Sequence, residues 1–161
     1  MSAGAHMACI LGVSSDHARL NGELGEHLEE TTEVTGVLAL YPPTDFLSVP
    51  KDFDGLLDYY AEDSPVTQLL GESITRAPEK SNLASTLRRF TGACPPTLFL
   101  HGEADPIVPV EQSVILHETL LAAGVDSDLM RLAGYTHGDH RFNRGAPAER
   151  INAYLKNRAT A

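Results

Sequence analysis

Two short runs of almost uninterrupted apolar residues constrain the fold most strongly. One spans residues 34–41 and ends at a Pro-Pro pair, and the other spans residues 97–102 and follows such a pair. A strand covered on both faces is apolar at nearly every position, whereas a half-exposed strand alternates apolar and polar residues. Both runs therefore predict buried strands of a parallel sheet, and a shorter run at 127–132 is a third candidate.

Helical patterns alternate with these runs. Residues 3–13 are rich in small and apolar side chains, residues 110–123 follow the second run, and residues 146–158 follow the third. Strands that alternate with helices favour an α/β fold with a parallel sheet. Residues 14–33 are polar and are interpreted as a loop with a helical turn.

The helix predicted over residues 110–123 has clear boundaries. Pro109 precedes it and Gly124 follows it, which are the residue types that commonly flank a helix start and a helix end. Its apolar side is expected to run along Val110, Val114 and Leu121, with Leu116 and Leu120 beside that stripe.

The segment 44–93 is the least regular part of the chain. Prolines and scattered acidic residues divide it into stretches suited only to short helices and turns. We therefore expect an irregular insert or cap-like segment between the first two strands, and we expect the whole chain, residues 1–161, to form a single partial domain.

Composition excludes several classes of partner. The chain has 161 residues with 42% hydrophobic and 21% charged residues, an ordinary globular balance, but its formal net charge is −10. An acidic surface repels nucleic acid and anionic membranes, so neither is expected as a partner. The first residues lack a basic segment and no apolar run approaches twenty residues. These residues taken alone would predict a cytoplasmic protein. The sequence leaves the actual compartment and the oligomeric state open.

The two cysteines do not form a metal or redox motif. Cys9 lies in the first helical run and is expected to be a small buried hydrophobe, while Cys94 lies in a loop. A disulfide between them is left open. No cluster of His, Cys, Asp or Glu has the spacing of metal ligands, so no metal site is predicted.

The first of three candidate site residues is Ser2. The segment Ser2-Ala3-Gly4 at the start of the first helical run matches the second half of a G-x-S-x-G nucleophile elbow. Small neighbours are needed there because the serine occupies a sharp, strained turn. The backbone N–H of Ala3 would then be an oxyanion donor. By itself an S-x-G motif near a terminus is weak evidence for a nucleophile. The alternative is that Ser2 is a disordered terminal residue.

The second and third candidates follow the second and third strands. Asp105 lies on the loop after residues 97–102, where it could orient a histidine, or could only stabilise a turn before Pro106. His137 lies in a glycine-flanked loop after residues 127–132, where it could meet Ser2 and Asp105, or could be an ordinary exposed loop histidine.

Three other histidines are given lesser roles. His140 is the rival of His137, but lacks a flanking glycine. His6 is expected to be structural, and His101, at a strand end, is expected to form local hydrogen bonds.

Taken together, these motifs resemble those of the acetyl esterase/lipase group of α/β-hydrolases. This group includes feruloyl and acetylxylan esterase-like (BD-FAE-like) carbohydrate esterases and, more distantly, prolyl oligopeptidase-like domains. Residues 2–8 (SAGAHMA) are similar to the S-A-G-G-H-L-A stretch of the group, and residues 41–45 (YPPTD) to its Y-P-x-x-D. Residues 63–67 (DSPVT), or alternatively the later stretch around Ser85, resemble its S-P segment. The most specific match begins at PPTLFLHG, residues 95–102, and continues through Asp105 and Pro109 to Ser113.

The resemblance implies a fold, a reaction and roles for three side chains. The fold would be the carboxy-terminal half of an α/β-hydrolase, with three parallel strands, flanking helices and the insert. Ser2 would be the nucleophile, Asp105 the acid of the triad and His137 the base, and the chain would cleave small acyl or sugar esters through an acyl-enzyme. No cofactor is implied, and the partner would be a small-molecule ester.

The chain also departs from the pattern of the group. The H-G-G-type oxyanion loop, the strand before the nucleophile and the first glycine of the elbow have no counterpart in the 161 residues. We therefore expect an amino-terminally truncated chain that is impaired, because loss of one oxyanion donor costs about 10²–10³ in rate.

Two other functions stay open. One is a prolyl-oligopeptidase-like peptidase domain, and the other is a catalytically dead hydrolase remnant with a binding or structural role. The residues do not identify the ester, because specificity would depend on segment 44–93 and on loops that the sequence lacks.

Overall fold

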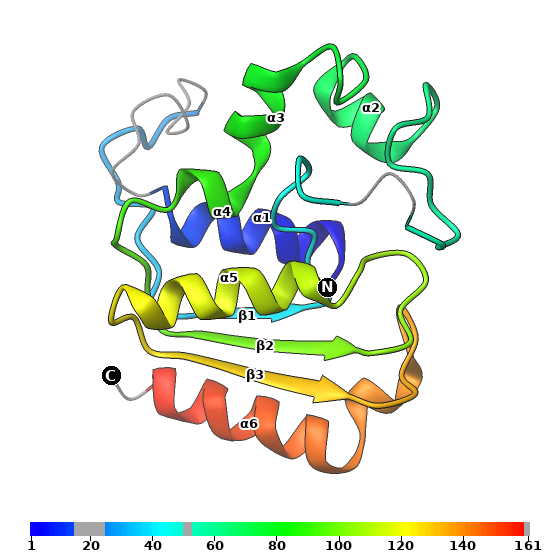
Figure 1. Cartoon of the computed structure of the whole chain (residues 1–161). Coiled ribbons are helices and arrows are strands. Elements are labelled where there is room, and N and C mark those ends of the chain that lie inside the picture. The colour runs from blue at the N-terminus through cyan, green and yellow to red at the C-terminus, as the bar shows by residue number, and fades with distance from the viewer. Residues whose placement is uncertain (15–24, 50–52, 160–161) are drawn as a thin grey trace.

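Three parallel strands form the centre of the molecule (Figure 1). The computed structural model describes residues 1–14, 25–49 and 53–159. The strands are β1 (Val37–Leu40), β2 (Thr97–Gly102) and β3 (Ser127–Leu132), in the order β1-β2-β3, with Leu38 opposite Leu98 and Leu98 opposite Asp128. The predicted α/β fold with three parallel strands is confirmed.

The bounds of the first strand differ from the prediction. Residues 34–41 were expected to be extended, but β1 covers only Val37–Leu40. At the carboxyl end, Tyr41 adopts a φ of 43°, a left-handed conformation that ends the strand. At the other end, Gly36 lies against the side chains of Tyr154 and Arg158, where a Cβ would find no room.

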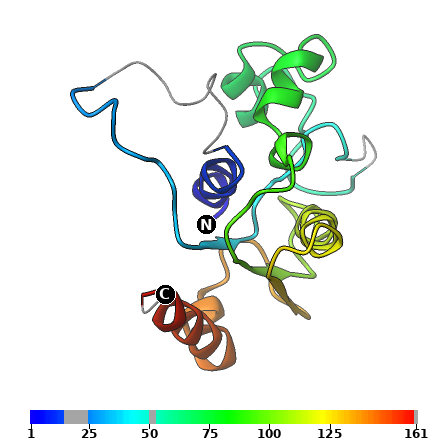
Figure 2. The same cartoon turned by 90° about the vertical axis from the view of Figure 1, so that its left-hand side faces the viewer.

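Helices cover both faces of the sheet. Helices α1 (Ala3–Gly12) and α5 (Glu111–Ala122) lie on one face, and α6 (Gly145–Ala159) lies on the other (Figures 1 and 2). All three helices lie within about two residues of their predicted ranges. In the described part of the chain, no helix is both long enough and apolar enough to cross a membrane.

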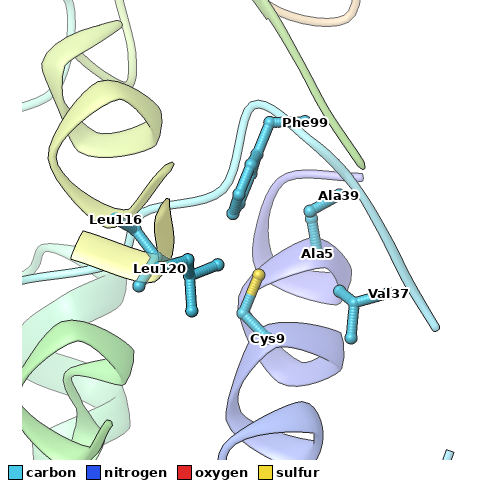
Figure 3. Packing of buried hydrophobic residues seen from close by; sticks show 7 residues of the cluster. All are labelled: Ala5, Cys9, Val37, Ala39, Phe99, Leu116 and Leu120. Atoms are coloured by element: carbon cyan, nitrogen blue, oxygen red, sulfur yellow. The ribbon is translucent and has the colours of Figure 1, made fainter. Parts of the chain in front are cut away.

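Alternating side chains of the strands enter two apolar clusters. The cluster between the sheet and helices α1 and α5 is shown in Figure 3 and consists of Ala5, Cys9, Val37, Ala39, Phe99, Leu116 and Leu120. The cluster on the α6 side contains Leu40, Leu98, Leu100 and Phe142, with Ile151 and Tyr154 of α6 packed against it. All residues of β2 are buried, as both flanks and both faces of this strand are covered.

The predicted apolar stripe of α5 was wrong at Leu121, whereas Val110 is buried as expected. Leu116 and Leu120 are each 1% exposed and form the buried stripe, whereas Leu121 is 49% exposed. Gln112 and Ser113, one turn earlier on the same side, are also buried. The helix is rotated relative to the prediction because these two polar residues have partners inside the protein.

The cysteines are both free thiols. Cys9 is buried, as expected, and burial raises the pKa of its thiol far above the usual range. Cys94 is half-buried. The disulfide that the sequence left open is therefore not formed.

In its described residues, 41–49 and 53–96, the segment between β1 and β2 contains three short helices. These are α2 (Pro65–Leu70), α3 (Pro78–Ala84) and α4 (Thr86–Arg89), in agreement with the predicted short helices and turns. The segment has an apolar cluster of its own, made of Phe46, Val49, Tyr59, Val66, Leu70 and Ile74. Its role as a cap-like insert stays a prediction. Of the polar loop expected over residues 14–33, residues 15–24 lie outside the described part.

Gln112 of α5 fixes the start of this segment. Its side-chain carbonyl accepts hydrogen bonds from the N–H groups of Thr44 and Asp45, each 2.8 Å long, and its amide nitrogen donates to Ser48 Oγ at 3.0 Å. Asp45 also forms an ion pair with Arg88 at 2.7 Å. These buried contacts explain why a glutamine is retained in the apolar side of α5.

Gly102 allows two loops to meet at the carboxyl end of the sheet. A Cβ at this position would collide with the backbone carbonyl of Tyr135. The N–H groups of Glu103 and Ala104 donate to the carbonyls of Leu132 and Tyr135, each at 3.0 Å. The loop after β2 and the loop after β3 are thereby joined.

We predict that Gly102→Ala destabilises the protein by about 1–3 kcal/mol, because the new methyl group meets backbone that cannot move aside. Gly4→Ala is the matched control, since nothing lies within 4 Å of a Cβ there, and a helical alanine is favoured over glycine by roughly 0.5–1 kcal/mol. Urea unfolding followed by circular dichroism measures both. Equal stabilities of the two variants would contradict the close approach at Gly102.

Candidate active site

Ser2, Asp105 and His137 come together at the carboxyl end of the sheet. Asp105 follows β2 and His137 follows β3, while Ser2 directly precedes α1. The N–H of Ser2 donates to the carbonyl of Leu40 at 2.9 Å, which ties Ser2 to the end of β1. Figure 1 shows the N-terminus beside the ends of the strand arrows.

Ser2 has a strained backbone. Its φ is 49° and its ψ is −124°, a combination that L-residues rarely adopt. Its carbonyl accepts a hydrogen bond from His6 N–H at 2.9 Å, so α1 begins immediately after it. The Ser2 hydroxyl does not cap this helix; instead Ser2 Oγ lies 2.9 Å from His137 Nε2.

The N–H of Ala3 is the first donor of α1. Residues in the first turn of a helix have no acceptor within the helix. Among the described residues, none accepts a hydrogen bond from this N–H. It is therefore available, at the positive end of the helix dipole, to a negatively charged oxygen beside Ser2.

Asp105 uses its two carboxylate oxygens differently. Oδ1 accepts hydrogen bonds from the N–H groups of Ile107 and Val108, at 2.8 and 2.9 Å, while Oδ2 lies 2.8 Å from His137 Nδ1. The two interpretations of Asp105 from the sequence, a turn residue and a partner of histidine, thus describe the same side chain. The turn holds the carboxylate, and the second oxygen faces His137.

The ionised form of Asp105 is strongly favoured. Burial alone would raise the pKa of this carboxyl group, but hydrogen bonds from His101, His137 and the N–H groups of Val108 and Ile107 outweigh it. Together they hold the pKa of Asp105 well below its usual range. A carboxylate at neutral pH is therefore expected here, although its side chain is fully buried.

The contacts of His137 define its tautomer. A carboxylate only accepts hydrogen bonds, so Nδ1 of His137 carries a hydrogen and donates it to Asp105. Nε2 is then an acceptor, and the hydroxyl of Ser2 donates a hydrogen bond to it. The result is one continuous chain of hydrogen bonds, in which Nε2 can take up a proton from Ser2.

His101 supports the same loop from inside the protein. Its side chain is fully buried, with Nε2 3.0 Å from the carbonyl of Val108 and Nδ1 2.7 Å from Ser113 Oγ. Nε2 therefore carries the hydrogen, and it also lies 3.5 Å from Asp105 Oδ2. The local hydrogen bonds expected for His101 are present, and they connect β2, the Asp105 loop and α5.

The side chains of His140 and His6, the remaining histidines considered in the sequence, form no part of this chain of hydrogen bonds. His140 has a side chain that is 74% exposed and lies 3.7 Å from Asp139. His6 is buried and donates from Nδ1 to the carbonyl of Pro43 at 3.1 Å. Burial lowers the pKa of His6, and the bond with Pro43 opposes this effect in part. The structure thus brings His137, and not His140, to Ser2.

Tyr41 was not identified from the sequence as a residue of the candidate site. Its ring centroid lies 4.6 Å from that of His137 and 5.1 Å from that of Phe142, and its φ is 43°. The ring is buried in the apolar cluster with Leu98 and Leu100 and also lies against the imidazole of His137. Only its position at a strand end hints at this contact, because an aromatic residue after an apolar run otherwise looks like part of the core.

A cavity of about 550 Å³ opens beside Ser2. Its walls come from α1, from the segment between β1 and β2, and from the loop after β2. The described residues contain no group of three or more His, Cys, Asp or Glu side chains that could hold a metal ion.

Comparison with known proteins places these residues in a family. A sequence model of the BD-FAE family matches residues 1–120. Esterase LipC of Mycobacterium tuberculosis is 31% identical over 140 residues, which cover 85% of this chain and 33% of LipC. The chain thus spans about a third of the length of this curated relative.

Solved structures share the fold. A truncated form of a carbohydrate esterase from gut microbiota has a TM-score of 0.85 at 23% identity and is matched over 100% of this chain and 58% of its own. An acetyl ester-xyloside bifunctional hydrolase from Caldicellulosiruptor lactoaceticus has a TM-score of 0.72 at 21% identity, over 98% of this chain and 53% of its own. The strands and helices described above therefore form part of an α/β-hydrolase fold.

The low pKa of Asp105 predicts an acid-dependent loss of stability. Because its pKa is lowered by folding, the ionised group contributes stability that is fully present above about pH 5 and is lost as the pH falls toward the folded-state pKa. The difference in free energy of unfolding between the wild type and Asp105→Asn should therefore shrink on acidification. Urea unfolding at about pH 7 and about pH 3 measures it. Asp54→Asn, at an exposed position, is the control, and a difference that stays constant with pH would refute the effect.

Proposed function

The chain belongs to the BD-FAE family of α/β-hydrolases, and from this premise we propose that it hydrolyses carboxylic esters with Ser2 as the nucleophile. The observation that carries the proposal is the chain of hydrogen bonds from Ser2 Oγ through His137 to Asp105, with lengths of 2.9 and 2.8 Å. A hydroxyl, a base and an acid in this relation are the arrangement that nucleophilic acyl transfer requires.

In the first step, Ser2 Oγ attacks the carbonyl carbon of the ester. His137 Nε2 takes the hydroxyl proton as the new C–O bond forms. Asp105 keeps the hydrogen on Nδ1 and stabilises the positive imidazolium that results. The low pKa of Asp105 suits this role, because the carboxylate stays ionised while the imidazolium is present.

The tetrahedral intermediate places a negative charge on the former carbonyl oxygen. The N–H of Ala3, at the first turn of α1, is the donor that this chain would offer to that oxygen. The intermediate then collapses, the bond to the alcohol breaks, and His137 returns its proton to the leaving alcohol. An acyl group remains on Ser2.

Water completes the cycle by the same route. His137 takes a proton from a water molecule, whose oxygen attacks the acyl carbon, and the proton passes to Ser2 Oγ as the acid leaves. We infer small acyl esters or esters of sugars as substrates. The support for this class is the names of the similar proteins, a carbohydrate esterase and an acetyl ester-xyloside hydrolase.

Labelling with a fluorophosphonate tests the proposal. We expect one adduct on Ser2 and none on Ser2→Ala, measured by intact mass and peptide mapping. Asp105→Asn and His137→Gln should be labelled roughly 10³-fold more slowly, since each removes part of the proton path. His140→Gln should react at the rate of the wild type. If Ser2 stays unlabelled, or if His140→Gln is the slow variant, the proposed site is wrong.

A further inference from the structure

The cavity beside Ser2 is lined mostly by apolar side chains. Its apolar lining includes Phe46, Leu57, Val66, Leu69, Ile107 and Val108. We propose that it binds a hydrocarbon group of the substrate and not a sugar ring, so that, among the small acyl and sugar esters proposed above, those with an alkyl chain longer than acetyl are preferred. This inference rests on the proposed function, since it takes Ser2 as the reacting group.

The cavity has a rigid floor and a more open rim. Phe46 and Val108 are each 2% exposed and Val66 is 6% exposed, so these three residues are held by the surrounding protein. Leu69 of α2 is 56% exposed and forms part of the rim. A volume of about 550 Å³ lies in the range of ordinary small-molecule sites and leaves ample room beyond an acetyl group.

The polar side chains of the cavity have partners within the protein. The hydroxyl of Tyr59 donates to the carbonyl of Ile107 at 3.0 Å, and the amide nitrogen of Gln68 donates to the carbonyl of Asp63 at 3.2 Å. His6 donates from Nδ1 to the carbonyl of Pro43. Each of these three side chains therefore already donates a hydrogen bond within the protein.

No side chain that lines the cavity is an aspartate, glutamate, lysine or arginine. A sugar ring or a charged group that entered the cavity would lose its hydrogen bonds to water and form few new ones with the walls. Its binding there is therefore unfavourable. An alkyl chain loses no hydrogen bonds on entry and gains apolar contacts. The chemistry of the walls thus selects a hydrocarbon group.

The hydrocarbon group can belong to either side of the ester. Ser2 and Ala3 line the cavity together, so the reacting carbonyl would lie at its mouth. From there either the acyl chain or the alcohol chain could extend inward. The chemistry is the same in both cases, and two series of substrates separate them.

The experiment measures kcat/KM for two ester series with the full chain. One series varies the acyl chain of p-nitrophenyl esters from acetate to octanoate, and the other varies the alcohol of acetate esters from ethyl to octyl. We expect kcat/KM to rise by roughly two- to fourfold per methylene in one series until the cavity is filled. Xylose tetraacetate, which presents a polar ring, should show no comparable gain over ethyl acetate.

A charge introduced at the rim of the cavity tests whether the alkyl chain of the substrate lies there. Leu69→Glu should lower the ratio of kcat/KM for the best long-chain ester to that for acetate by about tenfold, because the carboxylate opposes entry of an alkyl chain. Leu121→Glu is the matched control, since Leu121 is 49% exposed on α5 and does not line the cavity. This ratio should be unchanged in the control.

The outcomes separate this inference from the proposed function. Labelling rates with ethyl and octyl fluorophosphonates give the same comparison without turnover. If Ser2 reacts but its rate is independent of chain length, or if Leu69→Glu and Leu121→Glu behave alike, the hydrocarbon site is wrong and the nucleophile stands. If Ser2 reacts with no probe, the proposed function itself fails.

Discussion

The parallel pairing of β2 with β1 on one side and β3 on the other determines where every group of the site lies. Parallel strands end at the same edge of a sheet, so the loops that carry Asp105 and His137 leave side by side. The carbonyl of Leu40 at the end of β1 holds Ser2 at that edge. Burial of the whole of β2 makes this arrangement rigid, because apolar clusters cover both faces of the strand.

Two residues at this edge adopt conformations that cost on the order of 1–3 kcal/mol each, Ser2 and Tyr41. The surrounding structure stabilises both. Ser2 is held by its bond to Leu40 and by the packing of α1 against the sheet, and Tyr41 by its N–H bond to Leu100 at 2.8 Å and by its ring contacts. Both residues contact His137, Ser2 through its hydroxyl and Tyr41 through its ring.

The sequence was sufficient for the parts that depend on local patterns. The second and third strands were predicted at their observed bounds, since buried strands have a simple apolar signature. It also singled out the three residues that meet at the sheet edge, although their catalytic roles stay predictions. The stripe of α5 and the walls of the cavity depend on contacts such as that between Gln112 and Thr44, which are 68 residues apart and have no local pattern. The flanking Gly138 already favoured His137 over His140 in the sequence, but the contacts of His137 with Asp105 and Ser2 are visible only in the structure.

The central proposal is that Ser2 is a nucleophile that His137 deprotonates. Trapping the acyl-enzyme tests this most directly: the chain is mixed with a p-nitrophenyl ester, quenched in acid within seconds, and mapped by peptide mass spectrometry. The acyl group should be found on Ser2 of the wild type, and should be absent from Ser2 in His137→Gln. An acyl group on another residue, or equal acylation of Ser2 without His137, would contradict the account.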